Sequence, residues 1–262
     1  MDEEKLRTRL AALRRAVLGK NCVCAACGAD VFTEEKFCAR CLRALPFNRG
    51  HICRKCGRRI GGDYPVCLEC KAQMPLFEAA RSAFCYEGDI VRLIKKFKTG
   101  GRELSEALAG QMAPFLREGG AFAGAQLLVC VPMTEAARRK RGYNQSALLA
   151  EELEKLCGIP FGREVLVKTR ETEAQKGLGR RARADNLRGS FRVHERKACA
   201  GKTVVIVDDV MTTGATADAV AAALAGAGAK RVYLLTAASV PSRPQEGAEN
   251  VESAVKNALN IP

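Results

Sequence analysis

Residues 204–216, VVIVDDVMTTGAT, gather the most chemically active side chains of the chain. An apolar run ends in two carboxylates, Asp208 and Asp209, and a Thr-Thr-Gly turn follows them. Backbone N–H groups and hydroxyls in such a turn can bind a phosphate where a helix begins. The carboxylates would repel that phosphate, so we expect them to accept hydrogen bonds from the two hydroxyls of a ribose. An ordinary turn would explain neither the paired acids nor the Thr/Gly run. The segment therefore predicts a ribose-5-phosphate site, with the phosphate held by Thr212, Thr213, Gly214, Ala215 and Thr216.

Eight of the 13 cysteines form four C-x-x-C pairs. CAACGADVFTEEKFCARC at 24–41 (the first repeat) recurs as CRKCGRRIGGDYPVCLEC at 53–70 (the second repeat), with the same cysteine spacing. Four thiolates form a closed tetrahedral zinc site, so we expect two structural zinc ions rather than free thiols or redox pairs. We expect each repeat to bind its own zinc, and a cross-braced arrangement that mixes the repeats stays open. The expected ligands are Cys24, Cys27, Cys38, Cys41, Cys53, Cys56, Cys67 and Cys70; Cys22 is unassigned.

A glycine follows the first cysteine pair of each repeat, at Gly28 and Gly57. Glycine lets the backbone turn tightly enough to aim amide groups at thiolate sulfur.

The chain is strongly basic, with 43 Lys and Arg against 29 Asp and Glu and a formal net charge of +14. Eight thiolates with two zinc ions would lower this charge to about +10. The remaining excess favours polyanionic partners, either phosphorylated metabolites or nucleic acid. A hydrophobic fraction of 47% argues against disorder. We expect no membrane span and no secretory signal, because no apolar run is long enough. Together with the many thiols, this predicts a cytoplasmic protein.

A zinc module and an α/β sheet, flanked by a terminal helix and a tail, are the units expected to position these residues. Leucines at helical spacing predict an amphipathic helix over residues 1–20, and the cysteine repeats form a zinc module over 21–76. Beyond that, apolar strands alternate with helices and predict a parallel α/β sheet over 77–240. Its expected strands include 127–132, 164–168, 203–209 and 231–237. An Arg-rich segment, 170–189, precedes the acid-bearing strand, and 241–262 is expected to be a tail.

The two acids and the T-T-G-x-T turn resemble the signature of type I phosphoribosyltransferases. Over residues 22–240 the chain also resembles the ComF/ComFC family of competence-associated proteins, in which a double zinc ribbon precedes a phosphoribosyltransferase domain. Met133 stands where that family more often has Val. The resemblance implies a parallel-sheet type I phosphoribosyltransferase fold of class α/β, with an N-terminal double zinc ribbon. It is carried by R-G-Y-N-Q at 141–145 and by Gln175, Leu178, Arg183 and Asn186.

The resemblance further implies that the substrate is phosphoribosyl pyrophosphate (PRPP), with Mg²⁺ bridging its pyrophosphate and ribose oxygens. Thr212–Thr216 would hold the 5′-phosphate, and Asp208 and Asp209 the ribose hydroxyls. Departing pyrophosphate needs cations, so we expect Mg²⁺ and the catalytic candidates Arg138 and Arg141 to assist. The Arg-rich segment could close over the site or be a solvated loop. Pyrophosphate would leave past the loop formed by Pro132, Met133 and Thr134.

Three functions are compatible with these residues. We favour a PRPP-binding protein of DNA uptake and natural transformation that also binds single-stranded DNA and works with other uptake-machinery proteins. The alternatives are a metabolic phosphoribosyltransferase without a DNA role and a non-catalytic PRPP sensor. The basic runs exceed what one pyrophosphate needs, although base-stacking aromatics are sparse. The aromatics near basic clusters are Phe97, Tyr143 and Phe191. The acceptor and the occurrence of turnover stay open.

Overall fold

The computed structural model describes residues 23–31, 36–170, 187 and 189–242. The expected helix over 1–20 lies outside the described residues. So do the tail beyond Ser242 and most of the Arg-rich segment, with Gln175, Leu178, Arg183 and Asn186.

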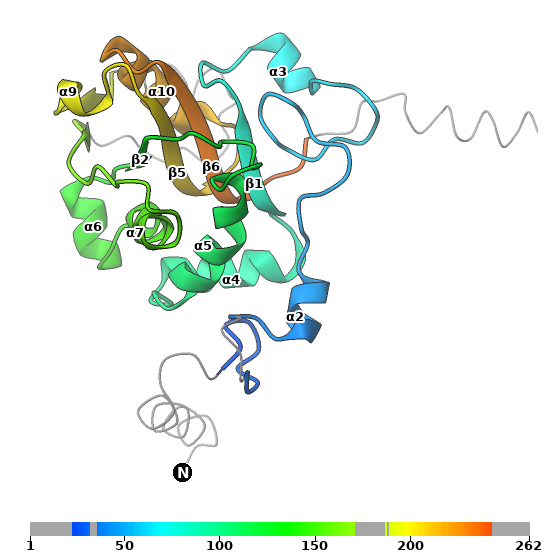
Figure 1. Ribbon diagram of the computed structural model, residues 1–262. Coiled ribbons are helices and arrows are strands. Elements are labelled where there is room, and N and C mark those ends of the chain that lie inside the picture. Colours follow the sequence, from blue (N-terminus) through cyan, green and yellow to red (C-terminus); the bar gives the residue numbers. More distant parts are fainter. Residues whose placement is uncertain (1–22, 32–35, 171–186, 188, 243–262) are drawn as a thin grey trace, which may run out of the picture.

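Four parallel strands form the central sheet in the order β1-β6-β5-β2 (Figure 1). This arrangement confirms the predicted parallel α/β sheet. The strands are β1 (Ala80–Cys85), β2 (Leu127–Cys130), β5 (Thr203–Met211) and β6 (Arg231–Ser239).

The central strand β5 is hydrogen-bonded on both sides, to β2 and to β6. Val204 to Val207 have no solvent exposure, as expected for a parallel strand covered on both faces. The strand continues to Met211, two residues beyond the predicted end, so the acids lie within it. Neighbouring side chains on a strand point to opposite faces. Asp208 and Asp209 are therefore not equivalent.

Residues 164–168 were expected to join the core sheet. Instead β3 (Leu166–Lys168) pairs antiparallel with β4 (Phe191–Val193) in a separate two-stranded sheet. The two strands flank the Arg-rich segment. With three residues each, they cannot supply the continuous apolar run of a buried parallel strand.

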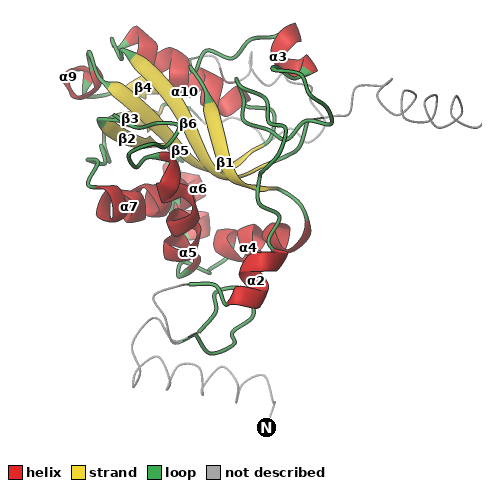
Figure 2. Ribbon diagram, turned by 45° about the vertical axis from the view of Figure 1, so that its right-hand side comes forward, coloured by secondary structure: helices red, strands yellow, loops and turns green. Residues whose placement is uncertain are grey.

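Helices cover both faces of the sheet (Figure 2). One face carries α5 (Leu104–Met112) and α7 (Gln145–Cys157), with α4 (Gly88–Lys98) and a 3₁₀ turn (Ala113–Phe115) beside them. The other face carries α10 (Ala215–Gly226). Short helices complete the described chain: α2 (Ala39–Ala44), α3 (Leu68–Ala72), α6 (Glu135–Arg141) and α9 (Arg196–Cys199). Among the described residues, none of the helices has the length and apolar character needed to cross a membrane.

Residues 46–55 run along the outer edge of β1. Cys85 N–H donates to Pro46 O (2.8 Å), Asn48 N–H donates to Ala83 O (3.0 Å) and Ala80 N–H donates to Lys55 O (2.8 Å). These bonds satisfy backbone groups that an open sheet edge would expose. The approach is close enough that a Cβ atom at Gly57 would lie 2.2 Å from Ala80 O. The second repeat is thus built onto the sheet.

The two repeats differ in what they pack against. The cysteines of the second repeat share an apolar core with Phe77, Ile206 and α10. The first repeat lies beside α4 and α5, where the Arg92 guanidinium donates to Ala26 O (3.4 Å) and Lys36 pairs with Glu106 (2.7 Å). Figures 1 and 2 both show α2 next to α4. The second repeat therefore packs in the cluster on the α10 face, whereas the first repeat adds Cys24, Val31 and Phe37 to the apolar cluster on the other face.

Candidate functional site

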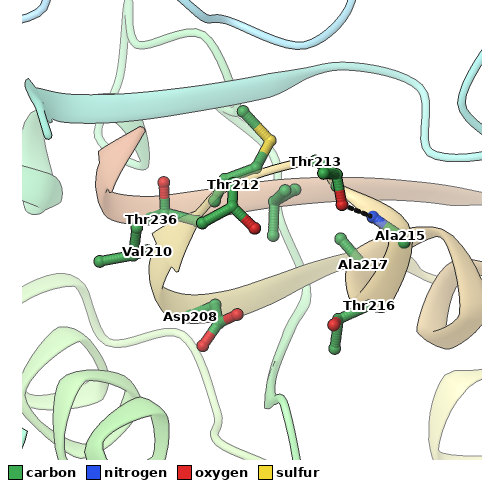
Figure 3. Close-up of a pocket in the computed structure, with 11 residues that line it drawn as sticks. Asp208, Val210, Thr212, Thr213, Ala215, Thr216, Ala217 and Thr236 are labelled. Atoms are coloured by element: carbon green, nitrogen blue, oxygen red, sulfur yellow. Dashed lines mark hydrogen bonds between the residues drawn. The ribbon is translucent and has the colours of Figure 1, made fainter. Parts of the chain in front are cut away.

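The turn between β5 and α10 lines a pocket at the C-terminal edge of the sheet (Figure 3). Gly214 has φ +81°, in the left-handed region, and α10 begins directly after it. The Thr213 hydroxyl accepts a hydrogen bond from Ala215 N–H (3.4 Å). All five residues predicted to bind phosphate line this pocket together with Asp208. The positive end of the α10 dipole faces the same space, which favours an anion there. The other lining residues are Val210, Met211, Ala217, Leu234 and Thr236.

Asp208 is the acid on the pocket wall. Its Oδ1 atom accepts hydrogen bonds from the Ser146 hydroxyl (2.7 Å) and from Asp209 N–H (2.9 Å). Burial, and secondarily the carboxylate of Asp209, raise the pKa of Asp208 to about 7, against a lowering by its hydrogen bonds and by Lys98. The carboxyl therefore exchanges a proton near neutral pH, and a nearby cation or hydrogen-bond donor would favour its charged form.

Asp209 does not line the pocket. Its Oδ2 atom lies 2.9 Å from Nζ of Lys98, the last residue of α4, and its Oδ1 accepts from Val210 N–H (2.7 Å). The sequence predicted that both acids hold ribose hydroxyls; of the two, only Asp208 lines the pocket together with Thr212–Thr216, the predicted phosphate loop.

The loop after β2 ends at the same edge of the sheet, because Cys130 is in register with Val207 of β5. Pro132, Met133 and Thr134 are half-buried, and the Thr134 hydroxyl caps α6 by accepting from Ala137 N–H (3.2 Å). None of these three residues lines the pocket.

The basic side chains of α6 are exposed and lie outside the pocket wall. Arg138 pairs with Glu135 (2.8 Å), and Arg141 donates to Gln145 Oε1 (3.2 Å). The predicted catalytic arginines are thus solvated in this structure.

The R-G-Y-N-Q element clamps three segments together. Gly142 ends α6 with φ +81°, and Asn144 caps α7 by accepting from Ser146 N–H (3.0 Å). The Asn144 amide also donates to Val131 O (3.0 Å). The Tyr143 hydroxyl donates to Phe97 O and accepts from Gly100 N–H (3.2 Å). The element therefore fixes the start of α7, where Ser146 reaches Asp208.

Base stacking by the aromatics named from the sequence is not supported. Phe97, Tyr143 and Phe191 are all buried in apolar clusters. Their proximity to basic residues in the sequence reflects core positions rather than a nucleic-acid surface.

Ser146, Lys98 and Thr236 are site residues that sequence reasoning missed. Ser146 is in the first turn of α7, 62 residues before Asp208, and Thr236 is opposite Asp208 on β6. Lys98 lies in the basic run KKFK. None belongs to a local pattern that predicts contact with the acids.

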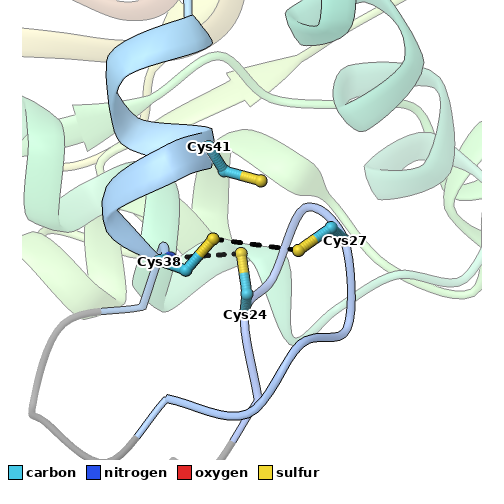
Figure 4. Close-up of side chains that lie close together, drawn as sticks. All are labelled: Cys24, Cys27, Cys38 and Cys41. Carbon is cyan, nitrogen blue, oxygen red and sulfur yellow. Dashed lines mark hydrogen bonds between the residues drawn. The ribbon is translucent and has the colours of Figure 1, made fainter.

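The eight predicted zinc ligands form two clusters, each from one repeat. Within each cluster the sulfur atoms all lie within 4.8 Å of one another. The Cys27–Cys38 sulfur distance is 3.8 Å (Figure 4), and the Cys56–Cys67 distance is 3.6 Å. Tetrahedral zinc with bonds of about 2.3 Å would place its sulfur ligands about 3.8 Å apart. The clusters therefore fit zinc, in the arrangement of one site per repeat rather than the cross-braced one.

Backbone amides donate to the sulfur atoms, among them Cys56 N–H to Cys53 Sγ (3.5 Å) in the turn before Gly57. Gly28 and Gly57 have φ +74° and +67°. Cys38 N–H donates to Cys24 Sγ (3.2 Å), and Cys67 N–H donates to Cys53 Sγ (3.4 Å). Such donors stabilise thiolates and orient them toward a metal.

The second cluster is connected to the phosphate loop. All four of its cysteines are buried, whereas Cys27 of the first cluster is exposed. After the second repeat, Leu76 N–H donates to Asp218 Oδ1 (2.6 Å) in the first turn of α10. Phe77 is fully buried, and its ring would lie 4.0 Å from a Cβ atom at Gly214. The second repeat therefore supports the pocket from behind.

Comparisons with known proteins agree with this architecture. Residues 139–260 match the phosphoribosyl transferase domain, and residues 15–71 match the double zinc ribbon domain. The chain is 30% identical to the DNA utilization protein YhgH of Escherichia coli K12, over 83% of this chain and 91% of that protein. It is 25% identical to competence protein F of Haemophilus influenzae, over 83% and 90% of the two chains. Identity to competence protein ComFC of Bacillus subtilis is 25%, over 70% and 75%.

Solved structures with partial similarity include a glutamine PRPP amidotransferase from B. subtilis, with 20% identity and a TM-score of 0.37. The match covers 52% of this chain and only 26% of that longer one. A purine phosphoribosyltransferase from Pyrococcus horikoshii has 17% identity and a TM-score of 0.34, over 56% of this chain and 88% of that one.

The strand order, the phosphate loop and the two domain matches define a type I phosphoribosyltransferase-fold protein with a double zinc ribbon. Within this class, the chain belongs to the ComF/YhgH family of competence and DNA utilization proteins.

The different surroundings of the two clusters lead to different expected effects of losing zinc. Elemental analysis should find about two zinc ions per chain, and Cys38→Ser and Cys67→Ser should each lose about one. Because Cys67 lies in the core of the sheet, Cys67→Ser should lower the thermal unfolding midpoint by about 10 °C or more. Cys38→Ser should lower it by less, because Cys38 is only half-buried at the margin of the other apolar cluster. Equal destabilisation by the two variants, or iron in place of zinc, would contradict this assignment.

Proposed function

We propose that the pocket between β5 and α10 binds PRPP. The observation that carries this proposal is that Asp208 and the phosphate loop share one pocket wall. Thr212–Thr216 would hold the 5′-phosphate with backbone N–H groups and hydroxyls. Asp208, oriented by Ser146, would accept the ribose hydroxyls.

Mg²⁺ suits the same site. Burial, and secondarily the Asp209 carboxylate, raise the pKa of Asp208, and a bound cation would favour its charged form. When bound among the substrate oxygens, Mg²⁺ would neutralise charge on the leaving pyrophosphate. Pyrophosphate would leave past the loop Pro132–Thr134, which lies at this edge of the sheet. Arg138 and Arg141 would have to turn inward to assist.

We assign two structural zinc ions to the cysteine clusters. Neither cluster leaves a ligand position open for chemistry, so their role is to hold the repeats. Thiols that must stay reduced to bind metal favour the cytoplasm as the location.

We further propose that the protein acts in DNA uptake or use, with other uptake-machinery proteins, and binds single-stranded DNA. The names of the relatives and the exposed basic face of α6 support this role. Because Phe97, Tyr143 and Phe191 are buried, binding would be electrostatic and tolerant of sequence.

Turnover distinguishes an enzyme from a PRPP sensor. The test is Mg²⁺-dependent release of pyrophosphate by the purified protein, with and without single-stranded DNA. If single-stranded DNA stimulates pyrophosphate release, the result supports a transferase that acts in DNA metabolism. If release is the same with and without DNA, the result supports a metabolic phosphoribosyltransferase without a DNA role. Calorimetric binding of PRPP without release supports a sensor, whereas neither binding nor release would exclude the site.

Asp208→Asn should weaken PRPP binding by about 2 kcal/mol, since hydrogen bonds to charged groups contribute roughly 1.5–3 kcal/mol. The wild-type affinity should also rise about tenfold from pH 6 to pH 8, as a carboxyl with a pKa of about 7 loses its proton. Calorimetry across this pH range measures the effect. The pH dependence of the affinity of Asp208→Asn is subtracted from that of the wild type, which removes the contribution from ionisation of PRPP itself. Identical pH profiles for the two proteins would contradict the assignment.

Binding of an oligonucleotide should weaken linearly with log salt, at roughly −0.7 per phosphate neutralised. Changing Arg138, Arg139 and Arg141 to Gln should reduce the slope by about two. A matched control changes three exposed cations at the opposite end of the sheet to Gln: Lys197, Lys230 and Arg231. The control should keep the wild-type slope. No binding at low salt would defeat the DNA proposal and leave the pocket functions standing.

A further inference from the structure

Lys98 contacts one of the two signature acids from a separate helix. Its Nζ atom lies 2.9 Å from Asp209 Oδ2, and the two side chains are 32% and 11% exposed. An ion pair this far withdrawn from water is screened less than a surface pair. Removing its cation would leave a buried carboxylate without its partner.

The end of α4 is fixed in place. The Tyr143 hydroxyl bonds to Phe97 O and Gly100 N, on either side of Lys98. Tyr143 precedes Asn144, which caps α7 and so places Ser146 against Asp208. Each acid is thus held by a different helix, Asp208 by α7 and Asp209 by α4.

Lys98 differs from the other lysines in the last turn of α4. Lys95 is exposed, and Lys96 pairs with Glu103 (3.0 Å). Cations are favourable at any helix C-terminus, so helix stability alone does not explain why Lys98 points at β5. Its charge also reaches past Asp209, because it lowers the pKa of Asp208 while burial and Asp209 raise it.

Two adjacent carboxylates are a poor setting for an anionic ligand. A phosphate at the α10 N-terminus and a pyrophosphate beyond it would be repelled by both charges. The ion pair with Lys98 cancels one of them. It also holds the Asp209 carboxylate on the α4 side of the strand.

We propose that Lys98 is a positioning residue of the PRPP site, which holds and neutralises Asp209 so that the anionic substrate meets the charge of Asp208 alone. This inference rests on the proposed PRPP function.

The test is a double-mutant cycle between Lys98 and Asp209, read as calorimetric affinity for Mg²⁺ with PRPP. Lys98→Met should weaken binding about tenfold, and Lys98→Arg should restore it to within about threefold. In the Asp209→Asn background no carboxylate needs a partner, so Lys98→Met should change affinity less than about threefold. Lys95→Met, on the exposed side of the same helical turn, is the matched control and should bind like wild type.

Each outcome decides between distinct conclusions. If the wild type binds PRPP and Lys98→Met binds it with the same affinity, the Lys98 inference is overturned and the PRPP site stands. A loss that persists in the Asp209→Asn background would overturn it too, because the effect would then not pass through Asp209. Absence of wild-type binding would overturn the proposed function and this inference with it. If Lys98→Met does not fold, two other variants still test the proposal. They are Lys98→Arg and the double variant Lys98→Met/Asp209→Asn, which buries no unpaired charge.

Discussion

The alternation of side chains along β5 is the constraint on which the site depends. Because β5 is hydrogen-bonded to β2 and β6, its residues cannot rotate independently, and adjacent acids must diverge. One face of the strand continues into the phosphate loop, and the other faces α4. Asp208 alone lines the pocket, and the two acids have different partners, Ser146 of α7 and Lys98 of α4, although they are neighbours in sequence.

The double zinc ribbon is not a separate appendage of this fold. The second repeat closes the exposed edge of β1 and contributes its cysteines to the core under α10. Through Leu76 and Phe77 the chain then contacts the first turn of α10 and Gly214. A metal in the second cluster would stiffen the segment that supports the phosphate loop. The first repeat packs against α4 and α5 and buries Cys24, Val31 and Phe37 in the apolar cluster on the face opposite α10.

The sequence predicts those features that arise from local chemistry. The apolar run of β5, the T-T-G-x-T turn and the cysteine spacing each have a short-range physical meaning, and the structure contains all three. The strand 164–168 was placed in the wrong sheet because its apolar run is too short to reveal its partner. Identical cysteine spacing could not show that all four cysteines of the second repeat are buried while Cys27 of the first is exposed, since burial depends on the surface each repeat packs against. The partners Ser146 and Lys98 are tertiary contacts, which no local pattern encodes.

The chemistry of the pocket wall bears on the choice between transfer and sensing. Of the residues that line it, Asp208 is the only one that titrates within the described chain. If its carboxylate accepts the ribose hydroxyls, it is not free to remove a proton from an acceptor. Transfer to an alcohol would need such a base, because an alcohol attacks poorly while it keeps its proton. An acceptor with an available lone pair, such as an unprotonated amine or ring nitrogen, would not need one before attack, and a sensor needs none at all. If the pocket holds PRPP as proposed, any transfer depends on a nucleophile that is already competent when it arrives.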